Sequence, residues 1–500
     1  MSVTEAEPVE TATEHFDVVI IGAGISGIGL AAHLRARLPQ KTFAILEMRE
    51  SLGGTWDLFR YPGIRSDSDM QTLGYRFKPW TDERAIADGP SILSYLAETA
   101  EESGARERIR FGHRVERATW SSEEALWTVE ASVVATGKRP TFRCSLVFSA
   151  TGYYDYDEPY RAPLEGLERF GGALVHPQFW PEDLDYEGKR VVVIGSGATA
   201  VTIVPAMAER AGHVTMLQRS PTYILAVPSV DGLDLLLRRL VGERLAYRLV
   251  RWKNIRMQAA IYGACKRWPR QMRRLIARLQ RPLLPEGYAQ DLHFKPRYDP
   301  WDQRVCLVPD GDLFRVLKSG EVSIETDTVK TFTETGIELG SGREIEADVI
   351  VTATGLKLKV FGGIDLVVDG EPVDVAATMA YRSMMLEGVP NFAFAIGYTN
   401  ASWTLKVDLV CEWVIRLLEH MDDAGHEICV PRNDDPSVEL EPLLDFQAGY
   451  VLRALDYLPK NGSRAPWQLK QHYPSDVETL RDGEIEGEGL AFERRRAAVA

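Results

Sequence analysis

FDVVIIGAGISGIGLAAHLRARLPQKTFAILEMRE, residues 16–50, contains every part of one βαβ unit. Residues 16–21 form a short apolar run that predicts a buried parallel strand. Apolar residues then recur at helical spacing to about Leu38, and a second apolar run at residues 42–46 predicts the neighbouring strand. Strand, glycine-rich turn, helix and strand in this order predict a dinucleotide-binding fold of the Rossmann type.

The turn of this unit has the pattern G-x-G-x-x-G, at Gly22, Gly24 and Gly27. In such turns the first glycine makes the tight bend, the second lets the backbone approach a pyrophosphate, and the third allows close packing of helix on strand. Ser26 can donate to a phosphate at the helix N-terminus, and Glu47, which ends the second strand, can accept from a ribose diol. A βαβ unit without a ligand is the alternative.

The pattern recurs in RVVVIGSGATAVTIVPAMAERAGHVTMLQRSPT, residues 190–222. Here the turn reads G-x-G-x-x-A, at Gly195, Gly197 and Ala200. The following strand ends in Arg219 and Ser220 rather than in an acid. An acid would repel a ribose 2′-phosphate, whereas a guanidinium would bind it. We therefore expect the second site to prefer NADP over NAD, the alternative being that Arg219 is a solvated loop charge.

Composition and charge exclude several classes of protein. The 500 residues are 45% hydrophobic and 26% charged, as in soluble globular proteins, and no apolar run reaches the ~18 residues that span a bilayer. The formal charge of −14 argues against general nucleic-acid binding. Five widely spaced cysteines and a polar N-terminus favour a reducing, cytoplasmic location. No group of His, Cys, Asp and Glu has metal-ligand spacing, so we expect no metal site.

Two dinucleotide-binding units imply two cofactors, and the first unit of such tandem chains usually binds FAD. Two short apolar runs that end in Ala-Thr-Gly, at residues 146–152 and 348–355, are typical of crossings between the two domains. We therefore predict an α/β fold with two Rossmann-like domains, for FAD and NADP, and a helical insertion. The expected boundaries are an acidic tail at 1–14, the FAD domain at 15–155 and 346–492, the NADP domain at 156–228 and 301–345, the insertion at 229–300, and a tail at 493–500.

The expected insertion has an unusual charge. Residues 231–299 contain sixteen Lys or Arg against six Asp or Glu, so this stretch is about +10 within a −14 protein. Its apolar residues recur at helical spacing and predict two or three amphipathic helices, with a break near Trp268 and Pro269. Three roles stay open for it: a cap on the active site, packing between subunits of an oligomer, and contact with an anionic membrane surface.

The residues after the first unit exclude the flavin disulfide reductases. Those enzymes need a cysteine pair near the flavin, but this chain has Gly53-Gly54-Thr55-Trp56 there and no cysteine before Cys144. Two longer motifs resemble the class B flavin monooxygenases, specifically the Baeyer–Villiger branch. F-x-G-x-x-x-H-x-x-x-W-P matches at Phe170, Gly172, His176, Trp180 and Pro181, and G-x-W-x-x-x-x-[FY]-P-G-x-x-x-D matches at Gly54, Trp56, Tyr61, Pro62, Gly63 and Asp67. The resemblance covers about residues 16–492.

The resemblance implies site residues at matching positions. For FAD these are Ser26, Glu47, Thr55, Trp56, Asp57, Leu58, Asp67 and Val115, the last through its backbone. For NADP they are Arg65, Ser66, Asp67, Gly195, Ser196, Gly197, Ala198, Thr199, Ala200, Val201, Arg219 and Ser220. Arg304 would be the active-site arginine, oriented by Asp67. Many relatives have lysine beside this arginine, so Gln303 implies weaker NADP selectivity.

The implied reaction uses NADPH to reduce the flavin and activates O₂ at its C4a atom. One oxygen atom then enters next to the carbonyl of a lipophilic ketone, giving an ester or lactone, and sulfides and thioamides are further expected substrates. Oxygenation of amines or sulfides alone is the alternative within enzymes. A flavin-binding redox sensor or a catalytically silent partner protein is the alternative from another class. We expect His176 and Trp180 to be structural, whereas Trp403 fits core packing and a place beside the substrate equally well.

Overall fold

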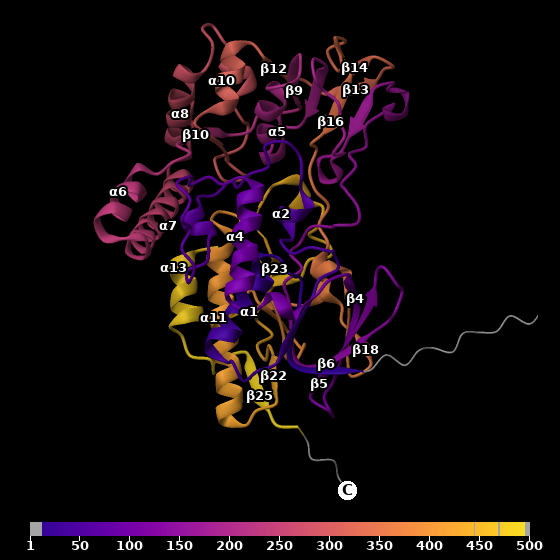
Figure 1. Ribbon diagram of the computed structural model, residues 1–500, viewed down its shortest axis with the longest axis vertical. Coiled ribbons are helices and arrows are strands. Elements are labelled where there is room, and N and C mark those ends of the chain that lie inside the picture. The colour runs from indigo at the N-terminus through magenta and orange to yellow at the C-terminus, as the bar shows by residue number, and fades with distance from the viewer. Residues whose placement is uncertain (1–12, 445, 469–470, 496–500) are drawn as a thin grey trace, which may run out of the picture.

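The computed structural model describes residues 13–444, 446–468 and 471–495. Nearly all of the predicted tail at 1–14, and the end of the tail at 493–500, lie outside these ranges. The described chain forms two lobes that each contain a sheet (Figure 1). In Figure 1 the lower lobe carries α1, α4 and α11, while the upper lobe carries α5 and α10.

The lower lobe is built on an 11-stranded sheet with the main order β18-β17-β4-β5-β6-β1-β2-β3. Its first βαβ unit is β1 (Glu14–Ile21), α1 (Ile25–Arg37) and β2 (Phe43–Leu46), and the two strands pair in parallel as predicted. Apolar residues on both faces of β1 are fully buried because helices cover one side and an antiparallel layer covers the other. The remaining strands are β3 (Ile109–Arg110), β4 (His113–Ser121), β5 (Leu126–Val133), β6 (Thr141–Ser149), β17 (Asp365–Val368), β18 (Glu371–Pro372), β19 (Ala380–Tyr381), β20 (Met385–Leu386) and β21 (Phe392–Phe394).

The upper lobe has a five-stranded parallel sheet of order β12-β9-β8-β16-β7. The predicted second unit is confirmed as β8 (Arg190–Ile194), α5 (Ala198–Ala208) and β9 (His213–Gln218). The other strands are β7 (Ala173–Val175), β12 (Val322–Thr326) and β16 (Val349–Thr352). The boundary predicted at residue 346 precedes β16, yet β16 pairs with β7 and β8, so the chain rejoins the first sheet only at β17.

Shorter strands and helices complete the lobes. The remaining strands are β10 (Ile224–Val227), β11 (Cys306–Pro309), β13 (Val329–Phe332), β14 (Gly336–Leu339), β15 (Glu344–Glu346), β22 (Ile428–Pro431), β23 (Leu440–Pro442), β24 (Lys460–Gly462) and β25 (Leu490–Glu493). The remaining helices of the lobes are α2 (Thr55–Leu58), α3 (Met70–Leu73), α4 (Gly89–Glu102), α9 (Gln290–His293), α10 (Asp312–Ser319), α11 (Trp403–Ala424), α12 (Gly449–Leu452) and α13 (Tyr473–Asp476). Helix α11 packs against α1, although their sequences are far apart.

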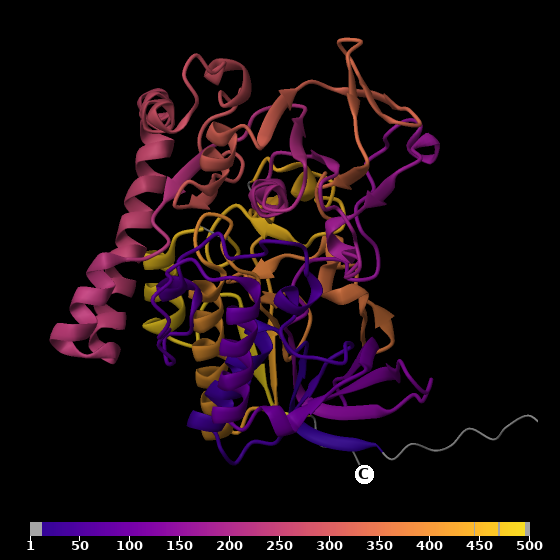
Figure 2. The ribbon, with the colours of Figure 1, turned by 45° about the horizontal axis from the view of Figure 1, so that its top comes forward.

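The helical insertion is confirmed as three helices: α6 (Gly232–Val241), α7 (Glu243–Arg267) and α8 (Pro269–Gln280). The predicted break lies at Trp268, because Pro269 cannot donate a helical hydrogen bond and suits the first position of a new helix. Figure 2 shows α7 as a long helix along the outside of the molecule. Within the described ranges, none of the helices combines the length and apolar character that crossing a bilayer requires.

Candidate functional site

One cavity of about 1010 Å³ is lined by the glycine-rich turns of both lobes. This volume lies at the upper end of ordinary small-molecule sites, which are about 300–1,000 Å³. The predicted site residues that line it are Gly22, Gly24, Ser26, Glu47, Thr55, Trp56, Arg65, Ser66, Asp67, Val115, Gly195, Ser196, Gly197, Ala198, Thr199, Val201, Arg219, Ser220 and Arg304. The fold therefore brings two distant sequence motifs into one space.

The first glycine turn has no room for side chains at two positions. Gly22 has φ +105°, and a Cβ atom there would lie 2.7 Å from the carbonyl oxygen of Ala150. A Cβ atom on Gly27 would lie 2.0 Å from the carbonyl oxygen of Gly22. Gly27 does not line the cavity, so its role is the close packing of α1 on β1. The turn thus exposes its backbone to the cavity at Gly22 and Gly24.

Glu47 lies at the end of β2 with its carboxylate buried in the cavity wall. It accepts hydrogen bonds from the backbone N–H of Ala23 at 2.7 Å and of Arg49 at 2.9 Å. Burial raises the pKa of Glu47, and these two N–H groups partly oppose that rise. Val115, on strand β4, also lines the cavity, and the backbone N–H of His113 at the start of β4 donates to the carbonyl oxygen of Glu47 at 2.9 Å. A carboxylate beside exposed strand backbone suits the ribose and base of a nucleotide.

Two of the residues that are expected to contact FAD, Asp57 and Leu58, do not line the cavity. Asp57 accepts from the side chains of Arg49 at 2.6 Å and Arg60 at 2.9 Å, and Leu58 packs into the core of the upper lobe. Their backbone N–H groups donate to Gly54. Neither residue lines the cavity, and the cofactor contacts expected of them stay predictions. They hold the short helix α2, which presents Thr55 and Trp56 instead.

The second glycine turn is equally crowded at its first position. Gly195 has φ +143°, and a Cβ atom there would lie 2.3 Å from the carbonyl oxygen of Ala353. The hydroxyl of Ser196 donates to the carbonyl oxygen of Ser220 at 3.1 Å and lies 2.8 Å from the hydroxyl of Thr222. The start of α5 faces the cavity, but Ala200 is fully buried behind it and packs in the core. The N–H groups at this helix start can bind an anion.

Arg219 and Arg65 give this part of the cavity its positive charge. Arg219 is exposed and, among the described residues, has no ion-pair or hydrogen-bond partner. Arg65 is held by a bidentate contact to Asp312 of α10, with the shorter distance 2.5 Å. Gln303 also lines the cavity. Arg219 is thus the cation that is available to a phosphate.

Arg304 and Asp67 form an ion pair in the cavity wall. The Nε and Nη2 atoms of Arg304 lie 2.9 and 2.7 Å from Oδ2 of Asp67, and its Nη1 donates to the carbonyl oxygen of Thr399 at 2.8 Å. Burial lowers the pKa of Arg304, but Asp67 together with Tyr450 and Tyr153 more than offsets this, so the pKa lies above its usual value. The expected pair is formed, and the guanidinium is held from two separate segments.

Comparisons with known proteins support the flavoenzyme interpretation. A family model described as pyridine nucleotide-disulphide oxidoreductase matches residues 19–230. The FAD-containing monooxygenase EthA of Mycobacterium tuberculosis is 56% identical over 488 residues, covering 97% of this chain and 99% of EthA. The chain belongs to the family of FAD-containing monooxygenases. The putative FAD-containing monooxygenase MymA of the same organism is 51% identical over 485 residues, covering 96% and 98% of the two chains.

Solved structures confirm the fold of this FAD-containing monooxygenase. Oxidized steroid monooxygenase bound to NADP has a TM-score of 0.74 at 21% identity, covering 96% of this chain and all of the other. Cyclohexanone monooxygenase with bound ε-caprolactone has a TM-score of 0.72 at 21% identity, with the same coverage. At this identity the likeness concerns the fold alone. It matches the predicted α/β architecture of two nucleotide-binding domains with a helical insertion.

The cysteines of the chain do not support disulfide chemistry at this site. All five cysteines are free and buried, and only Cys306 lines the cavity. The name of the matching family model includes disulphide oxidoreductases, but that chemistry needs two cysteines that can pair beside the flavin. The exclusion of the disulfide reductases therefore agrees with the geometry.

The residues that match the motif F-x-G-x-x-x-H-x-x-x-W-P do not line the cavity. His176 accepts through Nδ1 from the backbone N–H of Gln178 at 3.2 Å and caps a short 3₁₀ turn. A Cβ atom on Gly172 would lie 2.4 Å from the carbonyl oxygen of Asp348. Trp180 packs against the core of the upper lobe. These contacts agree with the structural interpretation of His176 and Trp180 in the monooxygenase.

Several tyrosines of the cavity wall were not predicted. Tyr153 and Tyr154 directly follow the first Ala-Thr-Gly, and Tyr450 comes from α12. Burial raises the pKa of all three, so they stay protonated at neutral pH. Trp403 lies beside them: its ring centroid is 5.1 Å from that of Tyr153, and its Nε1 donates to the hydroxyl of Ser26 at 3.1 Å. The position of Tyr153 directly after the Ala-Thr-Gly turn could have indicated from the sequence that it lines the site. Nothing in the sequence around Tyr450 indicates this.

Three side chains, one of them far from the other two in the sequence, lie close enough together for a metal ion to bridge them. His420 in α11, His426 just after it, and Glu486 have one ligand atom each within 4.8 Å of one another. Glu486 reaches the two histidines only through the fold, and the expectation that the chain has no metal site stays a prediction. These residues do not line the cavity, so they lie apart from the nucleotide site.

Proposed function

We propose that this chain binds FAD and NADPH in its cavity and acts as a Baeyer–Villiger monooxygenase on a lipophilic ketone, with sulfides and thioamides as further substrates. The observation that carries the proposal is the Arg304–Asp67 pair in a cavity shared by two nucleotide-binding turns. Relatives named FAD-containing monooxygenases and neighbours of the same fold that hold FAD and NADP support it.

The lower lobe fits FAD. The backbone around Gly22 and Gly24 lines the cavity and would bind the pyrophosphate, Glu47 would accept from the ribose diol, and the backbone of Val115 would pair with the adenine. Thr55 and Trp56 border the space that leads toward the upper lobe. Bound flavin would supply the redox and oxygen-activating chemistry, and the protein supplies binding, orientation and electrostatics.

The upper lobe fits NADPH. The start of α5 presents N–H groups to the pyrophosphate, and Arg219 is the cation that a 2′-phosphate would meet. Arg65 and Ser66 come from the lower lobe and border the same space. NADPH would thus touch residues of both lobes in the cavity that FAD would share.

Arg304 would stabilise the negative charge that develops during oxygen transfer. A guanidinium stays cationic at any working pH, and Asp67 and Thr399 fix its position before the reaction. A unit positive charge ~4 Å from a developing anion contributes about 4 kcal/mol at an effective dielectric constant of about 20. That energy corresponds to roughly a thousandfold in rate. The tyrosines and Trp403 around it restrict water, which protects the reaction from side products.

The test compares Arg304→Ala with Arg304→Lys and with Arg297→Ala, an exposed arginine nearby that does not line the cavity. We expect Arg304→Ala to keep flavin reduction by NADPH but to lower ester formation from a phenylketone by roughly a thousandfold. Arg304→Lys should retain part of the activity, and Arg297→Ala nearly all of it. Undiminished ester formation by Arg304→Ala would contradict the proposal.

Product identification separates the proposed reaction from its alternative. The wild-type enzyme is given a phenylketone and a thioether in parallel under NADPH and air. Ester from the ketone supports the Baeyer–Villiger reaction, whereas sulfoxide without ester supports oxygenation of heteroatoms alone. NADPH consumption that releases only hydrogen peroxide would contradict both, and would favour a redox sensor.

A further inference from the structure

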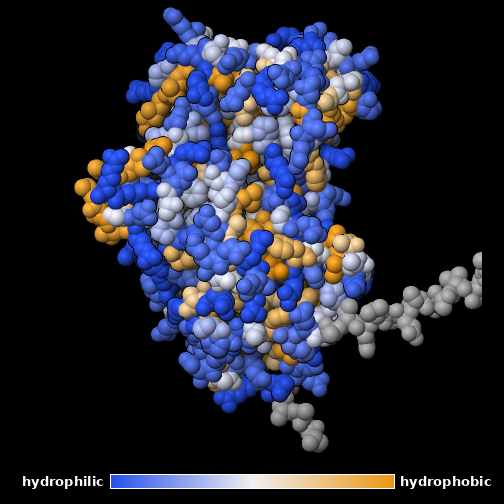
Figure 3. All heavy atoms as spheres, in the orientation of Figure 1, coloured by the Kyte–Doolittle hydropathy of each residue, from blue (hydrophilic) through white to orange (hydrophobic). Residues whose placement is uncertain are grey.

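The insertion helices expose an unusual number of apolar side chains. Of the twenty large hydrophobic residues that are exposed in the described ranges, twelve lie between residues 233 and 279. They are Leu233, Leu236, Leu240, Val241, Leu245, Leu249, Trp252, Met257, Ile261, Trp268, Leu275 and Leu279. Figure 3 shows hydrophobic side chains gathered on the projecting end formed by α6. We call this set the apolar face of the insertion.

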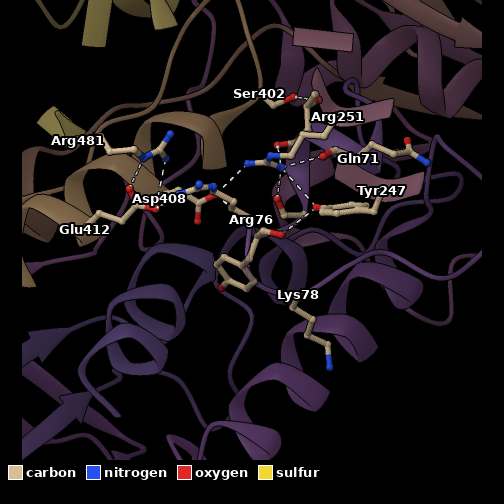
Figure 4. A network of polar contacts seen from close by, with 12 residues as sticks. Gln71, Arg76, Lys78, Tyr247, Arg251, Ser402, Asp408, Glu412 and Arg481 are labelled. Atoms are coloured by element: carbon tan, nitrogen blue, oxygen red, sulfur yellow. Dashed lines mark hydrogen bonds and ion pairs between the residues drawn. The ribbon is translucent and has the colours of Figure 1, made fainter. Parts of the chain in front are cut away.

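The apolar face points outward because polar contacts hold the opposite sides of α6 and α7 against the rest of the protein. Arg251 of α7 is buried, donates to Asp408 of α11 at 2.8 Å, and donates to three backbone carbonyls that include Gly74 (Figure 4). Asp234 of α6 is also buried, accepts from Nε2 of Gln71 in α3 at 3.1 Å, and pairs with Arg238 of its own helix at 2.6 Å. These polar anchors determine which side of each helix faces the protein. Leu236 and Leu240, and then Leu245, Leu249 and Trp252, therefore point outward at helical spacing.

Cations surround the apolar face. Ten arginines of the insertion have no acidic partner among the described residues: Arg239, Arg244, Arg248, Arg256, Arg267, Arg270, Arg274, Arg278, Arg281 and Arg297. All ten are exposed. Two of them lie over exposed tryptophans: Arg256 is 4.5 Å from the ring centroid of Trp252, and Arg267 is 5.6 Å from that of Trp268. Exposed apolar side chains, tryptophans and arginines are thus interspersed along the insertion.

We propose that this surface docks on a lipid bilayer that carries negative charge. Amphipathic helices that lie in a bilayer interface combine leucine and tryptophan with basic residues, and tryptophan prefers the level of the headgroups. A second copy of this chain would cover the apolar side chains but would bring two sets of unpaired arginines together, which costs energy. An anionic bilayer instead meets both the apolar and the charged part of the surface.

Vesicle sedimentation tests the proposal on the full-length holoenzyme. We expect the protein to pellet with vesicles of phosphatidylcholine and phosphatidylglycerol at low salt, to be released as salt rises, and to stay in solution with phosphatidylcholine alone. Fluorescence of Trp252 and Trp268 should shift to the blue only with the anionic vesicles. Equal pelleting with both kinds of vesicle, or none at low salt, would overturn the proposal.

Paired variants separate the two parts of the surface. Arg244→Gln/Arg248→Gln should weaken binding to anionic vesicles roughly 25-fold, because each basic residue near the surface contributes about fivefold. Leu236→Ser/Leu240→Ser should weaken it by about tenfold or more through lost apolar burial. Leu440→Ser, an equally exposed leucine outside the insertion, is the matched control and should bind as the wild type does. Wild-type binding by both insertion variants would overturn the proposal.

Light scattering in the absence of lipid tests whether a second copy of this chain covers the apolar face instead. A monomer whose mass is unchanged in Leu236→Ser/Leu240→Ser supports the bilayer as the occupant. A dimer that these substitutions dissociate would show that the apolar face is already covered, and would overturn the proposal.

Discussion

Arg219 is the residue that should set the choice between the two nicotinamide cofactors. It borders the cavity as an exposed cation without an acidic partner among the described residues. A charge-assisted hydrogen bond contributes about 1.5–3 kcal/mol, so Arg219→Ala should weaken NADPH about 10- to 100-fold and leave NADH nearly unchanged. Steady-state KM values for both cofactors measure this. Arg315→Ala, an exposed arginine of α10 away from the cavity, is the control, and an unchanged preference in Arg219→Ala would remove the assignment.

His33 should make the stability of the protein depend on pH. This histidine of α1 has a buried Nε2 atom without a hydrogen-bond partner, and its ring contacts Phe77 edge-on at 5.2 Å. Burial lowers the pKa of His33 to about 4; Glu412 opposes the shift, and Arg37, Arg76 and Arg481 add to it. The unfolded chain therefore binds a proton below about pH 6.5, while the folded chain binds it only near pH 4.

The free energy of unfolding should therefore decrease as the pH is lowered from about 6.5 to about 4. Because the unfolded state binds more protons between about pH 6.5 and 4, acid favours it. We expect the wild type to lose roughly 1–2 kcal/mol between pH 7 and pH 5 that His33→Gln does not lose. Urea titrations at the two pH values measure the difference. Parallel losses in both proteins would show that His33 is not the group that titrates.

At the scale of elements, Arg251 joins α7 to the lower lobe. It pairs with Asp408 of α11 and binds backbone carbonyls of α3 and the residue after it. Burial raises the pKa of Asp408 even with Arg251 beside it. Removing one partner of a buried pair leaves an uncompensated charge, so Arg251→Met should cost about 3–5 kcal/mol at pH 8.

The pH dependence and a double variant identify the cause of this cost. In Arg251→Met the pKa of Asp408 should rise further, so the folded state holds a proton that the unfolded state releases, and the cost should shrink toward pH 5. Arg251→Met/Asp408→Leu should recover part of the loss, because no unpaired charge is left. The midpoint of urea unfolding measures both. A cost that is the same at pH 5 and pH 8 would point to lost packing instead.

Helices, strands and turns could be predicted from the sequence where the residues that determine them are close neighbours along the chain. The two glycine turns, the strands around them and the break at Trp268 follow from neighbouring residues, because turn geometry and helix termination depend on short segments. Arg304 and Asp67 came from a resemblance, since 237 positions separate them and no periodicity relates them. Tyr450 and the backbone of Thr399 complete the same wall from the C-terminal part of the chain, and only the fold reveals that.

At the scale of the whole molecule, the insertion contacts the segment that carries Arg304. Lys266 of α7 lies 2.8 Å from Asp302, and the rings of Tyr262 and Trp301 lie 5.9 Å apart. Docking of the insertion on a bilayer would therefore bring this side of the segment that carries Arg304 toward the membrane. A substrate dissolved in the bilayer would then be concentrated near the enzyme, because each buried CH₂ group contributes about 0.8 kcal/mol to partitioning.

Anionic vesicles should consequently lower the apparent KM several-fold for a long-chain methyl ketone but not for cyclohexanone or NADPH. For Leu236→Ser/Leu240→Ser, which stays in solution, the same vesicles should raise the KM of the long-chain ketone, because the bilayer withholds it from the dissolved enzyme. Initial rates with and without vesicles measure both effects, and Leu440→Ser is again the control. The opposite signs are decisive, because a general effect of lipid on the assay would move the KM of docked and undocked enzyme in the same direction.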